Sequence, residues 1–437
     1  MPEAVVVSAV RTPIGKLGGA LSPLAATTLG AEAVRIAVER SGVSPQDVQH
    51  AILGQVLQAG AGQAPSRQVT FNAGLPKTLT SETVNKVCAS GLLAIAMAHK
   101  LIASGQYQTV IAGGMESMSG APFLVPNARF GYKMGNGVFL DALVHDGLWS
   151  SFFHCTMADQ ADAVAAQLGV SRQAQDQYAL RSHTFAVAAH EQGRFADEII
   201  PLKVAVKAKG KLVADKMPLP RSLVGVGAMR ADETPEQFVA QPRHYSPYLV
   251  DAKAPFALVE RDEAPRKDTS LEALAKLPPI VPDGSVTAGN APGVNDGAAA
   301  LVLTSLGYAA SARLQPLAKI IAHATVAWDP PYLPLVPAMA AQKLLDAQGM
   351  SVDDIALWEI NEAFAAVTLS SVERLGIDLD RVNVDGGAIA LGHPLGCSGA
   401  RIVAHLIHAL RRRGGGYGVA AICSGGGQGD ALLVSVA

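Results

Sequence analysis

The fold of this chain is decided by two glycine-rich stretches near its C-terminus, Gly386-Gly-Ala-Ile-Ala-Leu-Gly-His393-Pro-Leu-Gly-Cys397-Ser-Gly-Ala-Arg401 and Ala421-Ile-Cys423-Ser-Gly-Gly-Gly-Gln-Gly429. Each stretch places a reactive side chain, His393 or Cys423, in a turn whose glycines allow tight folding and close approach to a ligand. Histidine and cysteine are the side chains that exchange protons near neutral pH. A third candidate, Cys88, lies far upstream in Asn85-Lys-Val-Cys-Ala-Ser-Gly91. Together they suggest a thiol nucleophile, a histidine partner and a second thiol that acts as acid or base.

The chain also contains an internal repeat. Residues 33–48 resemble residues 340–355, and in each an amphipathic helix runs into a Ser-x-x-Asp capping pattern and then a strand. Cys88-Ala-Ser-Gly matches Cys397-Ser-Gly-Ala at nearly the same spacing, and each is followed by a helical segment and a strand ending in glycines. Because the two matches are in register, the sequence predicts two copies of one strand–helix–strand unit.

Cys88 is expected at the N-terminus of a buried helix. Residues 92–102 are apolar almost all round, which is typical of a helix enclosed on every side. The positive end of the helix dipole and free backbone amides would then lower the pKa of the thiol into the range of about 3.5–7.5. An isolated cysteine is more often a small buried hydrophobe, but the strand-to-helix turn and the repeated glycine-rich site favour a reactive role here.

The composition is that of a large α/β enzyme. The 437 residues are 49% hydrophobic and 16% charged, which suits a chain with buried elements and more than one domain. The net charge is -2, and the basic run Arg411 to Arg413 is expected to close a helix before Gly414. Nucleic acid is therefore not an expected partner.

Targeting and redox signals point to the cytoplasm. The N-terminus lacks the basic and apolar regions of a signal peptide, and no apolar segment is long enough to span a bilayer, so no membrane partner is expected. The four cysteines show no metal-ligand spacing, so we expect no metal site and free thiols in a reducing compartment.

The region between the repeats is less regular. Residues 171–185 read as a helix, and residues 204–214 alternate and turn at Lys209-Gly210 as a hairpin would. Residues 218–255 are rich in proline and read as an ordered loop. We interpret residues 121–292 as an inserted loop or cap domain, because loops over a rigid scaffold are where substrate contacts gather.

Four motifs give the chain a family resemblance. It resembles the thiolases, in particular the acetyl-CoA C-acetyltransferases (3-ketoacyl-CoA thiolases), through Val84-Asn-Lys-Val-Cys88-Ala-Ser-Gly91, Asn361-Glu-Ala-Phe-Ala365, Gly386-Gly-Ala-Ile-Ala-Leu-Gly-His393-Pro and Cys423-Ser-Gly-Gly-Gly427. Supporting matches include Gly113-Gly-Met-Glu-Ser-Met118 and the segment 286–297. The likeness covers nearly the whole chain except about 204–258.

The resemblance implies a five-layered α-β-α-β-α fold built from two similar halves with an inserted loop/cap domain. It implies an N-terminal half of residues 1–120 plus 293–317, which carries the nucleophile. The loop/cap domain would span 121–292, with an extended insertion at about 204–258, and the C-terminal half 318–437. A homodimer or homotetramer is expected by the same analogy.

The resemblance also implies roles for individual residues. Cys88 would accept the acyl group, His393 would take its proton, and Cys423 would be the second acid/base, while Asn361 would hold a water for an oxyanion hole shared with His393. The other oxyanion hole would use the backbone amides of Cys88 and Gly425. Further positions match contacts to substrate and the coenzyme A chain: Leu148, Met157, Phe364 and Ala291. Cys397 is expected only to pack, and Glu362 and Asp385 to be structural.

The implied activity is reversible acyl transfer between acyl-CoA and CoA, with acetyl-CoA and acetoacetyl-CoA as the expected pair. It would proceed by thiolysis of a 3-ketoacyl-CoA or by Claisen condensation of two acyl-CoAs, through an acyl-Cys88 intermediate. Coenzyme A is a substrate in this chemistry, and no bound cofactor is expected. Two alternatives remain: a non-catalytic acyl-CoA-binding scaffold, and a decarboxylating condensing enzyme, although such enzymes tend to use two histidines where this chain has Asn361.

Two departures from the family pattern affect the coenzyme A contacts. Thr156 stands where the family often has histidine, with His154 nearby, and Pro292 stands where serine is usual. The first replaces the imidazole of one expected coenzyme A contact, and the second removes a hydroxyl that would face the pantetheine.

Overall fold

The computed structural model describes residues 2–205 and 256–437. Its N-terminal half contains five strands in a mixed arrangement, in the order β4-β3-β5-β12-β1. These strands are β1 (Ala4–Arg11), β3 (His50–Gly54), β4 (Thr80–Val84), β5 (Thr109–Ser117) and β12 (Asn295–Ser305), with the short β2 (Gly15–Lys16) beside β12. The pairs β3–β4 and β3–β5 are parallel, and β12 runs antiparallel to both of its long neighbours.

The C-terminal half repeats this arrangement. Its strands lie in the order β14-β15-β16-β13, and they are β13 (Ala318–Ala327), β14 (Ile355–Ile360), β15 (Gly416–Ser424) and β16 (Gln428–Val436). The pair β14–β15 is parallel, as β3–β5 is, and an isolated parallel bridge from Trp358 to Val382 occupies the place that β4 has in the other half. The two halves meet where Val5 and Val6 of β1 pair with Lys319 and Ala318 of β13.

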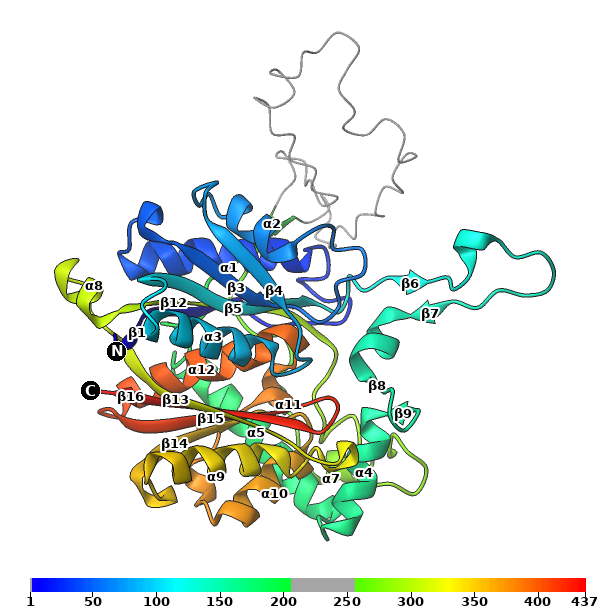
Figure 1. Ribbon diagram of the computed structural model, residues 1–437. Coiled ribbons are helices and arrows are strands. Elements are labelled where there is room, and N and C mark those ends of the chain that lie inside the picture. Colours follow the sequence, from blue (N-terminus) through cyan, green and yellow to red (C-terminus); the bar gives the residue numbers. More distant parts are fainter. Residues whose placement is uncertain (1, 206–255) are drawn as a thin grey trace.

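Helices separate and cover the two sets of strands (Figure 1). Helices α3 (Ser90–Ala103) and α12 (Leu395–Arg412) lie between them, in contact with each other and with strands of both halves. Helices α1 (Ala26–Ser41) and α2 (Pro65–Asn72) cover the outer face of one half. Helices α9 (Val336–Gln348) and α10 (Ala365–Leu375) cover the other. The predicted five layers are therefore confirmed.

The repeat seen in the sequence is a structural repeat. Helix α1 leads through the Ser44-capped turn Pro45–Asp47 into β3, and α9 leads through the Ser351 capping box at Val352–Asp354 into β14. Helix α12 ends at Arg412, as the basic run before Gly414 predicts.

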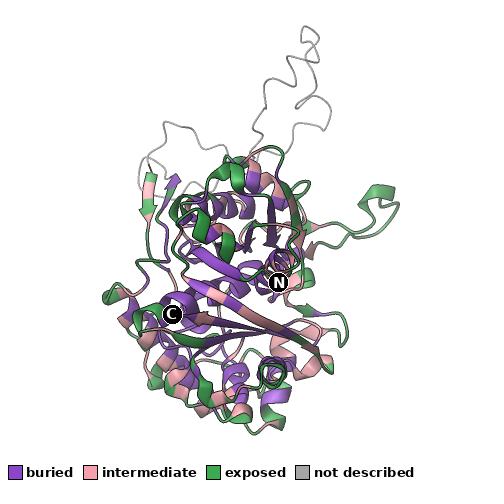
Figure 2. Cartoon of the chain, turned by 60° about the vertical axis from the view of Figure 1, so that its left-hand side comes forward, coloured by how far each residue is buried: buried purple, intermediate pink, exposed green. Residues whose placement is uncertain are grey.

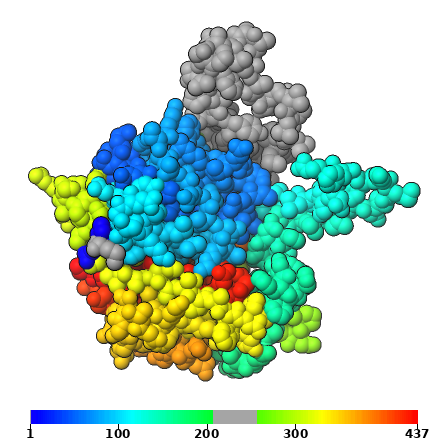
Figure 3. Space-filling view, in the orientation of Figure 1, coloured from blue at the N-terminus to red at the C-terminus, as the bar shows by residue number. Residues whose placement is uncertain are grey.

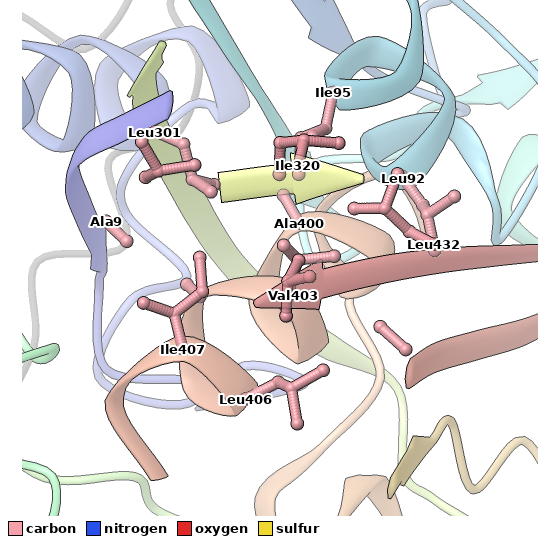
Figure 4. Packing of buried hydrophobic residues seen from close by; sticks show 14 of the residues in the cluster. Ala9, Leu92, Ile95, Leu301, Ile320, Ala400, Val403, Leu406, Ile407 and Leu432 are labelled. Carbon is pink, nitrogen blue, oxygen red and sulfur yellow. The ribbon is translucent and has the colours of Figure 1, made fainter. Parts of the chain in front are cut away.

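The middle layer forms the largest part of the core. Leu92 and Ile95 of α3 and Val403, Leu406 and Ile407 of α12 belong to one buried cluster, which strand residues of both halves, such as Leu301 and Leu432, complete (Figure 4). Figure 2 shows that most strands and the central helices are buried, whereas β4 and β13 are largely intermediate.

The intervening region is built of short elements. They are β6 (Phe123–Leu124), β7 (Leu140–Asp141), the π-helical Leu143–Leu148, β8 (Trp149–Ser150), β9 (Cys155–Thr156), α4 (Met157–Gln167), α5 (Arg172–Glu191), β10 (Leu202–Ala205), β11 (Phe256–Val259) and α7 (Leu271–Ala275). Helix α5 confirms the helix predicted over 171–185. The turn at Lys209-Gly210 and the proline-rich 218–255 lie outside the described residues. Two further short helices are α8 (Leu306–Ser311) and α11 (Ala388–Leu391).

Arg11 fastens one end of the antiparallel β10–β11 pair, where β10 begins and β11 ends, to the body of the molecule. Its guanidinium forms a 2.6 Å ion pair with Glu198, just before β10, and a 2.7 Å ion pair with Asp262, just after β11. Burial alone would raise the pKa of Asp262, but Arg11 and His190 lower it to about 2. The carboxylate therefore stays ionised and paired at neutral pH.

Within residues 2–205 and 256–437, no helix is both long and apolar enough to cross a membrane.

Replacing Gly399 by alanine should destabilise the protein, because α12 crosses α3 at this glycine. A Cβ added there would lie 2.4 Å from the backbone nitrogen of Leu92. Overpacking of this kind costs roughly 1–3 kcal/mol, so the melting temperature should fall by several degrees. Gly307→Ala in the exposed helix α8 is the matched control, because no heavy atom lies within 4 Å of its added Cβ. Its melting temperature should be unchanged or higher, and equal melting temperatures for the two variants would contradict the close crossing.

Candidate active site

The predicted reactive residues lie at the ends of repeated elements. Cys88 stands in the turn between β4 and α3, and His393 stands in the turn between α11 and α12. Cys423 is the penultimate residue of β15, and Asn361 directly follows β14. Because β14 and β15 are parallel neighbours, their carboxyl ends lie at the same edge of the sheet. The backbone amide of Asn361 donates a 2.9 Å hydrogen bond to the Ala421 carbonyl.

These turns enclose a cavity of about 300 Å³. Eight predicted site residues line it: Cys88, Leu148, Met157, Ala291, Phe364, His393, Cys423 and Gly425. Most of the remaining lining side chains are apolar, including Met118, Leu333 and Leu395. The exception among the predicted residues is Asn361, which is fully buried behind the wall.

The Cys88 turn is held in a strained conformation. Val87 has a φ of +46°, which is a genuine outlier for a β-branched residue. The Val87 amide donates to the Asn85 side chain at 2.9 Å, and the Lys86 amide donates to the Ser90 hydroxyl at 2.8 Å. Strain of this kind persists only where the surroundings hold it, and it is common at reactive turns.

The expected lowering of the Cys88 pKa is wrong. Cys88 does precede α3, but burial of the sulfur raises the pKa of the thiol to about 12. Hydrogen bonds from the backbone amides of Cys88 and Gly425 oppose this rise without cancelling it. In the apolar cavity the cost of removing a thiolate from water exceeds the benefit of the helix N-terminus. Cys88 is therefore a neutral thiol at rest, and two backbone amides face its sulfur.

His393 is a neutral imidazole with a defined tautomer. Its Nδ1 lies 2.6 Å from the Ser398 hydroxyl, and that hydroxyl donates its own proton to the Pro394 carbonyl at 2.9 Å. Nδ1 must then be the donor to Ser398, which leaves Nε2 unprotonated. Nε2 has no hydrogen-bond partner among the described residues. Burial and, to a smaller extent, Arg401 lower the pKa of His393 to about 3, so this nitrogen carries no proton at neutral pH.

Cys423 is a second neutral thiol close to the first. It is fully buried, and burial together with the neighbouring Cys88 raises its pKa well above the usual value. A Cβ added to Gly425 would lie 3.4 Å from the Val87 side chain, so the two thiol-bearing turns are in contact. Gly426 and Gly427 have φ values of +80° and +68°, which explains why this turn needs glycine.

Asn361 has an unusual environment. Neither atom of its side-chain amide has a hydrogen-bond partner among the described residues, although the residue is fully buried. The neighbouring Glu362 is fully engaged, since it accepts hydrogen bonds from Tyr178 at 2.7 Å, Ser182 at 2.8 Å and the Ile389 amide at 2.9 Å. Glu362 therefore fixes the backbone around Asn361, as expected of a structural residue, and leaves the Asn361 amide available to bind a polar group.

Comparison with known proteins identifies the family. Residues 4–231 and 246–306 match the thiolase N-terminal domain, and residues 314–436 match the thiolase C-terminal domain. The chain belongs to the thiolase family. The unmatched residues 232–245 are fewer than the 204–258 that we expected to lack a counterpart.

Individual thiolases are similar over their whole length. The chain is 42% identical to an acetyl-CoA acetyltransferase of Chromobacterium violaceum over 433 residues, which is 99% of each protein. It is 40% identical to an acetyl-CoA acetyltransferase of Pseudomonas aeruginosa over 436 residues, which is 100% of each. The crystal structure of the Bacillus anthracis acetyl-CoA acetyltransferase superposes with a TM-score of 0.87 at 36% identity, covering 100% of this chain and 99% of that one.

The positions where this thiolase departs from the family pattern have structural explanations. Thr156 begins α4 with a capping box, in which its hydroxyl accepts from the Asp159 amide and Asp159 accepts from the Thr156 amide. Pro292 lines the cavity, where it adds apolar surface. Cys397 is 1% exposed within the middle-layer core, which confirms its expected packing role.

Sequence reasoning missed three residues that support the site of this thiolase. Ser398 fixes the His393 tautomer, and Asn295 accepts a 2.9 Å hydrogen bond from the His393 amide. Glu116 accepts from the amides of Val56 and Gly396, both at 3.0 Å, and so joins turns of the two halves. Burial raises the pKa of Glu116 to about 7. Both Ser398 and Glu116 lie inside motifs already noted, but the motifs alone do not show which backbone groups they reach.

Alkylation of Cys88 by iodoacetamide should accelerate with pH without levelling off between pH 7 and 10. A thiol with a pKa of about 12 gains roughly tenfold in thiolate for each pH unit over this range. Peptide mass spectrometry of Cys88 gives the rate, and the urea-unfolded chain is the control, whose rate should level off above about pH 9. A plateau in the folded protein below pH 8 would instead indicate a preformed thiolate.

Proposed function

We propose that this thiolase transfers acyl groups reversibly between acyl-CoA and CoA, with acetyl-CoA and acetoacetyl-CoA as its substrates. The observation that carries the proposal is the convergence of two neutral thiols, one unprotonated imidazole nitrogen and two inward-facing amides on one apolar cavity. The acetyl-CoA acetyltransferase relatives that match over their full length support the choice of acyl group.

Cys88 is the proposed nucleophile and His393 its base. In thiolysis the Cys88 sulfur attacks the ketone carbon of acetoacetyl-CoA while its proton passes to Nε2 of His393. The bond between the ketone carbon and its neighbour then breaks, which leaves acetyl-Cys88 and the enolate of acetyl-CoA. A soft thiolate suits this step because it is both a good nucleophile and a good leaving group.

Cys423 is the proposed acid for the departing carbon. Its thiol protonates the enolate, and the resulting thiolate takes the proton of the incoming CoA thiol. That CoA sulfur attacks acetyl-Cys88, which releases a second acetyl-CoA and returns the Cys88 thiol. Claisen condensation is the same sequence reversed. Two separate acid/base groups are needed because one serves sulfur and the other serves carbon.

Oxyanion stabilisation is proposed at two places. The amides of Cys88 and Gly425 face the Cys88 sulfur and would bind the thioester oxygen of the acetylated enzyme. Asn361, through a bound water, and Nε2–H of protonated His393 would bind the enolate oxygen. Fixed donors of this type are each worth about 3–4 kcal/mol in the transition state.

The division of the chain into two halves and a cap, as expected from the sequence, is also part of the proposal. Residues 1–120 plus 293–317 and residues 318–437 would be the two thiolase halves, and residues 121–292 the cap. Cap residues Leu148, Met157 and Ala291 line the cavity, so the cap would select the acyl chain and hold the coenzyme A arm. All four cysteines are free thiols, which accords with the proposed cytoplasmic location.

Conversion of acetoacetyl-CoA and CoA into acetyl-CoA tests the function, with products separated by chromatography. Cys88→Ala should lower kcat at least about 1,000-fold because the covalent route is lost. Cys423→Ala should lose thiolysis equally but should still accept acetyl on Cys88 from acetyl-CoA, as seen by mass spectrometry. Cys397→Ala, a buried thiol outside the cavity, is the matched control and should keep its activity.

A wild-type protein that neither turns over nor becomes acetylated would contradict catalysis and favour an acyl-CoA-binding scaffold. Acetylation without turnover would contradict the acetoacetyl-CoA assignment alone.

Self-association is the second part of the proposal. The arm (residues 121–142) stands out from the body in Figure 3 and carries highly exposed apolar side chains, among them Phe130 at 86% and Met134 at 96%. Apolar side chains gathered in this way mark interaction sites, so we propose that the arm packs on a second copy of the chain in a homodimer or homotetramer.

Light scattering after size exclusion tests the arm. The double variant Phe130→Ser, Phe139→Ser should have a lower molar mass than the wild type, because two exposed aromatic contacts are lost. Tyr417→Ser, at an exposed aromatic on β15, is the control and should leave the mass unchanged. A monomeric wild type would contradict self-association.

A further inference from the structure

Lys86, two residues before Cys88, is fixed at three points. Its amide donates to Ser90 at the start of α3, and its carbonyl accepts from the Ser424 hydroxyl of β15. Its Nζ lies 2.6 Å from Asp430 Oδ2 and donates to the Thr325 hydroxyl at 2.8 Å. The Lys86 side chain is only 14% exposed, and these contacts bind one residue of the N-terminal half to three strands of the C-terminal half.

Asp430 is fully buried on β16. It lies opposite Ile422, the residue before Cys423, and opposite Thr325 of β13. Its Oδ1 accepts from Nε2 of His323 at 2.8 Å, so both carboxylate oxygens face polar partners. A buried carboxylate is unfavourable unless it is paired, and Lys86 supplies the cation that pairs it.

The Lys86 contacts act on the two thiol-bearing turns at once. Val87 separates Lys86 from Cys88 and has its strained φ of +46°. Ser424, which holds the Lys86 carbonyl, directly follows Cys423. The two thiols come from different halves of the chain, so their relative position depends on contacts that cross between the halves, and the Lys86–Asp430 pair is a buried ionic contact of that kind.

We propose that Lys86 and Asp430 form a positioning pair for Cys88. The pair holds the strained turn so that the Cys88 sulfur and amide stay aligned with Cys423 and Gly425. Neither residue touches the substrate cavity, so the pair acts on the chemical step through Cys88 rather than on substrate binding. The inference deepens the proposed thiolase function and rests on it for its kinetic predictions.

The test is a double-mutant cycle with Lys86→Met, Asp430→Asn and the double variant. Each single change should lower kcat for acetoacetyl-CoA thiolysis about tenfold or more, with KM changed less than threefold. The double variant should be no slower than the slower single variant, because the two residues act as one unit. Lys86→Arg should keep more activity than Lys86→Met, since it retains the charge.

Lys319→Met is the matched control. Lys319 lies on β13, the strand that also carries Thr325, but at the end away from the thiols. Its Nζ forms a 2.5 Å ion pair with Glu3. Its kcat should match the wild type. Thermal melting of every variant identifies simple loss of folding, and assays are made well below the lowest melting temperature.

Wild-type kcat in Lys86→Met, or losses that multiply in the double variant, would overturn the proposal. The rate of Cys88 alkylation by iodoacetamide separates this inference from the proposed function. If the wild type has no thiolysis activity, an altered alkylation rate in Lys86→Met and Asp430→Asn but not in Lys319→Met still supports the positioning pair. Unaltered rates in all three overturn it.

Discussion

The close contact of backbone between the two halves is the constraint on which the site depends. A Cβ on Gly114 would lie 1.9 Å from the Gly396 carbonyl oxygen, and one on Gly91 would lie 2.7 Å from the Ala400 nitrogen. Helix α12 can therefore pack this closely on β5 and α3 only where those elements carry glycine. Because the halves are repeats, the turns that precede these two helices are brought together, one with Cys88 and the other with His393. The convergence of Cys88 and His393 on one cavity follows from the fold's internal symmetry.

The same enclosure sets the electrostatics of the site. Burial raises the pKa values of Cys88 and Cys423 and lowers that of His393, so all three groups are neutral at rest. A low-dielectric cavity makes each charge expensive until a partner or an oxyanion donor accompanies it. Charge should then appear only when substrate is bound and the proton moves from sulfur to nitrogen. In the proposed mechanism, the backbone amides of Cys88 and Gly425 and the unpartnered side-chain amide of Asn361 would accompany that charge.

The sequence could predict the parts of this site that are local or repeated. The capping patterns at Ser44 and Ser351 and the matched cysteine turns were sufficient for the two-half architecture. The sequence could not predict the direction of the Cys88 pKa shift, because a helix N-terminus is visible in sequence but burial by a distant half is not. Glu116 escaped for a related reason, because its partners are backbone amides, which carry no residue signature. Ser398 escaped because its contact with the His393 ring depends on how the turn between them folds. The pairing of β10 with β11 was missed too, because the two strands lie more than fifty residues apart in sequence. They pair at Leu202↔Val259.

The buried Arg11 clamp has a consequence for how such a chain can change over time. Glu198 and Asp262 anchor β10 and β11 to Arg11 of β1. Because these two strands pair with each other, the distance between residues 205 and 256 is also fixed. Closing a longer loop between fixed ends is inexpensive, at about 0.6 kcal/mol for each doubling of its length. We therefore expect the body of the protein to keep its fold when the number of residues between these two points changes.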